Sequence, residues 1–177
     1  MTQNRTIYRD TVRPEWVDYN GHLRDAFYML IFSLSTDAFM DRIGLDEAGR
    51  TSRGRSLFTL EAHINYLHEI KEGTAVRVEA SVLALDAKRV HLYMEMFADE
   101  GTEPIAASEQ MLLHVDTTNG AKSAAFDADI AGRIEAMFLD AAKAPNEARY
   151  AGRVIGLPSG PRASAASASA ATGTKPA

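Results

Sequence analysis

One stretch of the sequence limits the possible folds more than any other, because residues 23–43 are apolar around most of a helical circumference. Two adjacent faces of this predicted helix carry the following apolar side chains: Tyr28, Phe32, Phe39 and Ile43, with Leu30, Ile31, Leu34 and Ala38 beside them. Such a helix is buried on most sides rather than lying half-exposed on a surface. Gly44 follows it directly and is a typical helix stop. The rest of the chain must therefore enclose this helix.

Four runs of alternating apolar and polar residues follow, at 58–66, 76–82, 90–96 and 104–115. A period of two predicts antiparallel strands that have one covered face. In the first run, the face expected to be covered consists of Phe58, Leu60, Ala62, Ile64 and Tyr66. We also expect a first strand within 6–17 that breaks at Pro14, a loop over 46–55, and a final helix over about 129–143.

This order of elements predicts an α+β fold, in which a five- to six-stranded antiparallel sheet wraps around a long central helix. A sheet that curls in this way leaves an edge strand and an open face, and pairing of two protomers is a common way to cover them. We therefore expect a homodimer or a dimer of dimers.

The composition narrows the class of protein further. The 177 residues suffice for one domain, predicted at 1–155, and the Ser-, Ala-, Gly- and Pro-rich remainder, 156–177, is predicted to be a disordered tail. The net charge of −5 disfavours nucleic acid as a partner. No apolar run approaches the roughly 20 residues that cross a bilayer, and no secretory signal is apparent, so we expect no membrane association. The absence of cysteine fits a reducing compartment, which favours a cytoplasmic location.

The densest group of reactive residues is Asp18, Asn20 and His22, just before the long helix. A helix N-terminus offers unpaired backbone N–H groups, here around Arg24 and Asp25, and a positive dipole end that can stabilise an oxyanion. A carboxylate at Asp18 could attack a carbonyl or activate water. Asn20 could hold a water molecule, and His22 could orient groups or shuttle protons. The same pattern is also typical of an ordinary turn and helix cap, so both interpretations stand at this point.

The run 18–23, Asp-Tyr-Asn-Gly-His-Leu, followed by Tyr28, resembles the Asp-x-Asn-Gly-His-Val motif of hot-dog thioesterases related to 4-hydroxybenzoyl-CoA thioesterase and the acyl-carrier-protein thioesterases. Two weaker blocks, at 62–73 and 114–116, are also similar to that family. The resemblance implies a hot-dog fold, a coenzyme A thioester substrate, active sites at a dimer interface and no cofactor. It implies that Asp18 is the nucleophile or general base and that Asn20 and His22 support it.

The chain departs from the family pattern at two places. Arg24-Asp25 stands where the family often has Asn-Asn, and 123–126 lacks the usual proline. Within the superfamily, the run 16–28 resembles the thioesterases of carnitine degradation, which release betaine from betainyl-CoA.

Aromatic faces bind quaternary ammonium groups. The residues predicted to contact the substrate near the loop are therefore Trp16, Tyr19, Tyr28 and Tyr66, with Gly21. Core packing is the alternative for each aromatic residue and is favoured for Phe27.

A polar row on the strand at 58–66 adds two candidates, Glu61 and His63, which could line a substrate site shared across a dimer. A solvated sheet face is the alternative. Lys88 and Arg89 are candidates for contacts with the phosphates of coenzyme A, although a turn with two basic residues is commonly only solvated. The histidines and carboxylates show no ligand spacing, so no metal is expected.

Three other functions remain open, and the first is hydrolysis of another small acyl-CoA. A hot-dog hydratase would carry a proline and an aliphatic residue between the asparagine and the histidine, whereas only Gly21 separates Asn20 from His22. A non-catalytic acyl-CoA-binding protein is disfavoured by the intact set of Asp18, Asn20 and His22.

Overall fold

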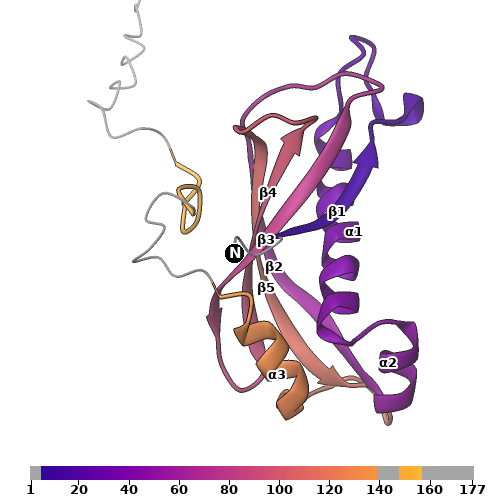
Figure 1. The fold of residues 1–177 in the computed structure, drawn as a ribbon, viewed down its shortest axis with the longest axis vertical. Helices are drawn as coiled ribbons and strands as arrows, with labels where there is room; N and C mark the ends of the chain where they lie inside the picture. The colour runs from indigo at the N-terminus through magenta and orange to yellow at the C-terminus, as the bar shows by residue number, and fades with distance from the viewer. Residues whose placement is uncertain (1–4, 139–147, 157–177) are drawn as a thin grey trace, which may run out of the picture.

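The computed structural model describes residues 5–138 and 148–156, so the predicted tail lies outside the described residues apart from Gly156. A curled antiparallel sheet lies against one long helix, α1 (Figure 1). The strands are β1 (Thr6–Thr11), β2 (Arg55–Tyr66), β3 (Ala75–Leu85), β4 (Arg89–Ala98), β5 (Pro104–Asp116) and β6 (Lys122–Ser123). Their order is β1-β3-β4-β5-β2, with β6 paired to β5. The helices are α1 (Asp25–Ile43), α2 (Glu47–Arg53) and α3 (Ala128–Glu135), and a short 3₁₀ helix covers Pro14–Trp16.

Helix α1 is the centre of the core, as its apolar circumference predicts. Phe32, Phe39 and Ile43 are fully buried, and they share one apolar cluster with the inward-facing residues of β3 and β4. The hydroxyl of Thr36 on α1 donates to the side-chain oxygen of Gln110 on β5 at 2.9 Å. Gln110 therefore marks the face of β5 that is turned toward α1.

Two predicted segments differ from the structure. The expected loop at 46–55 contains α2, whose first turn is capped by the Asp46 carboxylate, which accepts the Gly49 N–H at 2.7 Å. This helix has no buried residue, so no apolar period signals it, and only its cap residues do. The helix expected over about 129–143 ends at Glu135, because Phe138 already forms a bridge with Val82 of β3. Residues 139–143 lie outside the described part of the chain.

The prediction of which face of β2 is covered is also wrong for a single chain. Phe58, Leu60 and Tyr66 are 45%, 56% and 54% exposed, and Leu57 is the buried residue of the strand. The pairing of β2 with β5 shifts register between Thr59 and Glu61, which interrupts the alternation. Because β2 lies at the edge of the sheet, no strand in the described part of the chain covers its far side.

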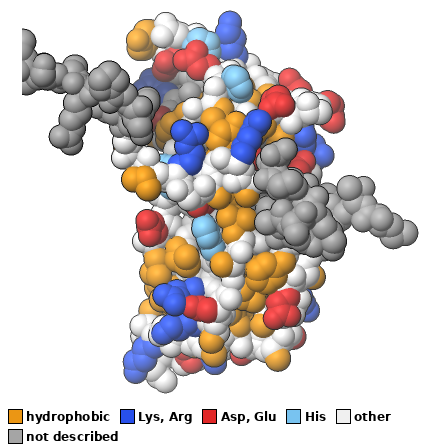
Figure 2. Space-filling view, turned by 90° about the vertical axis from the view of Figure 1, so that its left-hand side faces the viewer, with side chains coloured by type: hydrophobic (Ala, Val, Ile, Leu, Met, Phe, Trp, Pro, Cys, Tyr) orange, Lys and Arg blue, Asp and Glu red, His pale blue; other side chains and the backbone are white. Residues whose placement is uncertain are grey.

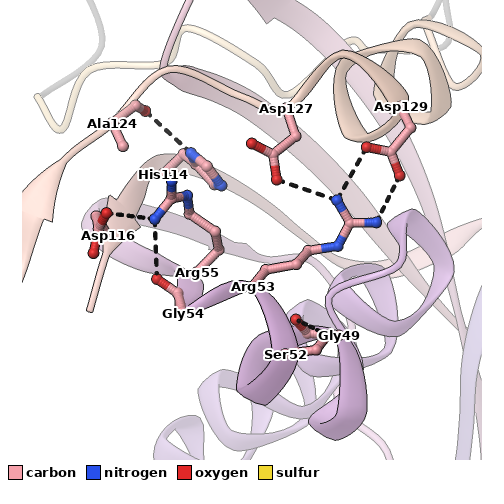
Figure 3. A network of polar contacts seen from close by, with 10 residues as sticks. All are labelled: Gly49, Ser52, Arg53, Gly54, Arg55, His114, Asp116, Ala124, Asp127 and Asp129. Atoms are coloured by element: carbon pink, nitrogen blue, oxygen red, sulfur yellow. Dashed lines mark hydrogen bonds and ion pairs between the residues drawn. The ribbon is translucent and has the colours of Figure 1, made fainter. Parts of the chain in front are cut away.

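A network of polar contacts joins α2 to the start of α3 at the end of the molecule where α1 terminates (Figures 1 and 3). Arg53, the last residue of α2, lies 3.1 Å from the carboxylate of Asp127 and 2.8 Å from that of Asp129, at the start of α3. Nearby, Arg55 pairs with Asp116 at the end of β5. These contacts hold α2 and α3 together and leave the other end of α1 to the loop that carries Asp18. Within residues 5–138 and 148–156, no helix is long and apolar enough to cross a membrane.

Candidate active site

The loop between the 3₁₀ helix and α1 is a tight turn that presents Asp18. The Asp18 N–H donates to the His22 carbonyl at 2.9 Å, and the Gly21 N–H donates to the Asp18 carbonyl at 3.0 Å. Val17 and Leu23 pair across its base. Gly21 has a φ of 76°, a left-handed conformation that glycine adopts readily and other residues rarely do. The glycine of the sequence motif is therefore what allows the turn to close.

The Asp18 carboxylate is held by the backbone of its own turn. Its Oδ1 accepts the N–H of Asn20 at 2.8 Å and the N–H of His22 at 3.1 Å. Its Oδ2 accepts no hydrogen bond within the described residues. The bond from the His22 amide lowers the pKa of Asp18 most strongly, and the Asn20 amide and the positive charge of Arg24 lower it further against the effect of partial desolvation. The carboxylate is thus ionised at neutral pH, with one oxygen available for chemistry.

Within the described residues, the N-terminus of α1 has no side-chain cap, in contrast to α2. The Arg24 N–H donates to the Trp16 carbonyl at 3.0 Å, so the prediction of an unpaired amide at Arg24 is wrong. The Ala26 N–H donates to the Asp25 carboxylate at 2.8 Å. The Asp25 N–H makes no hydrogen bond within the described residues. One amide of the first turn, at the positive end of the helix dipole, is therefore available to a ligand.

The loop between β2 and β3 is tied to the Asp18 turn. Leu23 donates its N–H to the Ile70 carbonyl at 2.9 Å, and His22 and Lys71 form a single bridge. This places the Glu69 carboxylate 3.8 Å from Nδ1 of His22. Glu69 is not among the predicted site residues, because nothing but its place within the 62–73 block distinguishes it from other surface carboxylates.

The four aromatic residues predicted to contact the substrate lie in three different settings. Tyr28 and Tyr66 meet edge to face at 5.4 Å, and the Tyr66 hydroxyl lies 3.4 Å from the Asp25 carbonyl, so both reach the start of α1. Tyr19 is 93% exposed at the tip of the turn. Trp16 is 4% exposed and stacks on Phe27 at 5.7 Å. Core packing therefore describes Trp16 and Phe27 in a single chain.

Burial also raises the pKa of the Tyr28 phenol, whose O–H donates to the His68 carbonyl at 3.0 Å. Tyr28 is thus a neutral, fixed residue that joins α1 to the loop between β2 and β3.

The remaining predicted residues lie elsewhere in the chain. His63 is on the face of β2 turned away from α1, with its Nδ1 3.5 Å from the Glu109 carboxylate, and Glu61 shares that face. Lys88 and Arg89 follow the far end of β3, whose first residue lies near the Asp18 loop. Eleven residues at about 3.3 Å each separate the two ends of β3 by roughly 35 Å. The fold of one chain therefore does not bring these four residues to Asp18.

The described residues contain no group of three or more His, Cys, Asp or Glu side chains that could hold a metal ion.

Comparison with known protein families shows the class of protein to which this chain belongs. The thioesterase-like superfamily matches residues 12–150, and the chain belongs to this superfamily. A crystal structure from Pseudomonas putida KT2440, provisionally named a thioesterase, is 50% identical, with a TM-score of 0.70 over 86% of this chain and 96% of that one. The predictions of a hot-dog fold and of a thioesterase are therefore confirmed.

Individual relatives with a stated substrate or ligand are similar to this chain over most of its length. A betainyl-CoA thioesterase of Pseudomonas aeruginosa is 50% identical over 158 residues, which cover 89% of this chain and 98% of that protein. An L-carnitine dehydrogenase/betainyl-CoA thioesterase of Agrobacterium fabrum is 43% identical over 111 residues, 63% of this chain but 22% of that longer protein. A Staphylococcus aureus protein solved in complex with CoA is 26% identical, with a TM-score of 0.71 over 86% of this chain and 96% of that one.

Proposed function

We propose that this protein hydrolyses acyl-CoA thioesters and that betainyl-CoA, which yields betaine and CoA, is its favoured substrate. The main support for this choice of substrate is the 50% identity to a betainyl-CoA thioesterase over 89% of the chain. The chemistry is supported by the ionised Asp18 carboxylate beside the uncapped start of α1. The absence of cysteine fits a cytoplasmic location for this activity.

Asp18 can act in either of two ways. Its Oδ2 can attack the thioester carbonyl and form an anhydride, which water then hydrolyses, or it can take a proton from a water molecule that attacks the same carbon. In both routes the C–S bond breaks, the departing thiolate takes up a proton, and water supplies the oxygen of the new carboxylate. The Asp25 N–H, at the positive end of the α1 dipole, would donate to the oxyanion that develops, and the dipole favours that negative charge.

The residues around the turn have supporting roles. The backbone N–H groups of Asn20 and His22 hold the carboxylate, which leaves their side chains to orient water and substrate. The half-exposed ring of Tyr66 and the exposed ring of Tyr19 offer faces to the trimethylammonium group of the betainyl chain. Each cation–π contact contributes about 0.5–2 kcal/mol, so we expect betainyl-CoA to exceed a neutral acyl-CoA of equal size by roughly 2- to 30-fold in kcat/KM.

We also propose that two copies of the chain associate through β2. Among the described residues this edge strand pairs with β5 alone, and it exposes Phe58, Leu60 and Tyr66, while Leu30 of α1 is exposed as well. An uncovered edge with large apolar side chains is a surface that soluble proteins normally cover. We expect light scattering to find a dimer or a dimer of dimers, and a Phe58→Lys/Leu60→Lys variant to dissociate. A monomeric wild type at micromolar concentration would contradict this assembly.

Thiol release from a panel of acyl-CoAs tests the function. We expect Asp18→Asn to lower kcat with betainyl-CoA by about 10²- to 10⁴-fold, because the proton acceptor or nucleophile is lost while the turn keeps an acceptor oxygen. Asp46→Asn is the matched control, since it removes the same charge from another aspartate whose carboxylate accepts a backbone N–H, at the start of α2, and it should retain wild-type turnover. Equal turnover of wild type and Asp18→Asn would refute the mechanism. Binding of CoA without turnover by the wild type would show a non-catalytic binding protein instead.

A further inference from the structure

A cavity of about 590 Å³ lies on the face of the sheet that is turned away from α1. It is enclosed by β2, β4, β5 and residues 152–155, and its charged and titratable wall residues are Glu61, His63, His91, Glu109 and Arg153. Figure 2 views the molecule from the side opposite α1 and shows apolar patches around a central histidine. The volume falls within the range of roughly 300–1,000 Å³ typical of small-molecule sites.

The floor of this cavity is a fixed carboxylate. One oxygen of Glu109 lies 3.0 Å from Nε2 of His91, and the Gly152 N–H donates to the same carboxylate at 3.0 Å from each oxygen. His63 approaches from the other side, and the Glu109 side chain is only 13% exposed. The bond to Gly152 also fixes the position of the next residue, Arg153, at the cavity wall.

Two opposite charges in the wall lack partners. Within the described residues, neither the Glu61 carboxylate nor the Arg153 guanidinium takes part in a hydrogen bond or ion pair, although both line the cavity. Nδ1 of His63 is buried and makes no hydrogen bond. Glu61 and Arg153 are exposed where they line the cavity, so their carboxylate and guanidinium are accessible to a ligand that carries the complementary charges.

The apolar part of the wall indicates what else the ligand carries. Met111 lines the cavity from β5, and Val154 and Ile155 line it from the C-terminal segment with their side chains largely exposed. Methyl groups of a ligand, including those on an ammonium nitrogen, would contact these side chains. A guanidinium recognises a carboxylate with two parallel hydrogen bonds.

We propose that this cavity is a second, non-catalytic binding site for a small zwitterion that carries both a methylated ammonium and a carboxylate. The ligand carboxylate binds Arg153, its ammonium faces Glu61 and Glu109, and its methyl groups contact Met111 and Val154. The site lies across the sheet from Asp18, so it does not depend on the proposed hydrolysis. If that hydrolysis holds, the acid it releases belongs to the same chemical class, and the site reports on the level of product.

Glycine betaine is the probe, and the Cε1–H signals of the five histidines are the readout in NMR titrations of the full chain. The signals are assigned from His63→Gln and His91→Gln variants. We expect betaine to shift the signals of His63 and His91 in the wild type and equally in Asp18→Asn, with no dependence on turnover. Arg153→Gln and Glu61→Gln should each weaken the apparent Kd at least tenfold, whereas Lys122→Gln, an exposed control on β6, should not change it.

Two further probes separate the charges. Choline has the ammonium without the carboxylate, and acetate has the carboxylate without the ammonium, so both should bind at least tenfold more weakly than betaine. Absence of any shift at His63 and His91 would overturn the proposal, as would equal affinity of wild type and Arg153→Gln. A betaine-dependent shift confined to His22 would place the ligand at the Asp18 site alone and would also refute a second site. The titration measures betaine binding and not acyl-CoA turnover, so failure of this proposal can be told apart from failure of the hydrolase proposal.

Discussion

Replacement of Gly21 by alanine tests whether the turn that carries Asp18 must keep its conformation. Gly21 has a φ of 76°, and a Cβ built on it would meet no heavy atom within 4 Å. The perturbation is therefore conformational rather than steric, and a left-handed alanine costs about 1–2 kcal/mol. Part of this is offset because alanine lowers the entropy of the unfolded chain by about 0.4–1 kcal/mol. We expect a net loss of about 1 kcal/mol, which corresponds to a decrease in Tm of roughly 2–4 °C.

The effect on activity should exceed the effect on stability. The turn can relieve its strain by opening, and this breaks the bond from the Gly21 N–H to the Asp18 carbonyl and displaces the His22 amide that holds the carboxylate. A strain of 1–2 kcal/mol lowers the population of the productive turn by about 5- to 30-fold. We expect kcat/KM for betainyl-CoA to fall by a similar factor.

Gly120→Ala is the matched control. Gly120 has a φ of 82° and open space around its Cβ position, but it lies beyond β5, at the other end of the molecule from Asp18. It should lose the same stability and keep wild-type kinetics. Differential scanning calorimetry and thiol-release assays on both variants give the comparison. A Gly21→Ala protein with reduced Tm and unchanged kcat/KM would refute the role of the turn.

Three other outcomes follow from the structure. Because the pKa of Asp18 is lowered, its carboxylate stays charged until the pH falls through that lowered value. Short assays should therefore show a constant kcat/KM through neutral pH and a decrease only below the ordinary carboxyl pKa of 3.8. A decrease that begins near pH 6 would contradict this prediction. Asp46→Ala should reduce the free energy of unfolding in urea by about 0.5–2 kcal/mol through loss of the α2 cap, and an unchanged value would deny the cap. Phe32→Ala should reduce the same quantity by about 3–5 kcal/mol, since Phe32 is fully buried, and a loss under 1 kcal/mol would argue against the core position.

The turn that carries Asp18 could be predicted from the sequence because its determinants are local. Asp18, Gly21 and His22 lie within five residues, and the hydrogen bonds that orient the carboxylate join these same residues. The start of α1 was predicted less well, since the Arg24 amide is taken by a carbonyl eight residues earlier. Glu69 was not predicted as a neighbour of His22, because their proximity depends on hydrogen bonds between two loops that are far apart in the sequence.

Periodicity by itself determined that this chain forms a long buried helix and a set of antiparallel strands, because the repeat of apolar residues reports local backbone geometry. Only the tertiary structure decided where each face of a strand points. It turned His63 away from α1 and toward Glu109 and His91, and it left Phe58 and Leu60 exposed. Alternation distinguishes two faces of a strand but does not say which one meets the helix, since that depends on strand order, on the register shift in β2 and on its place at the edge of the sheet.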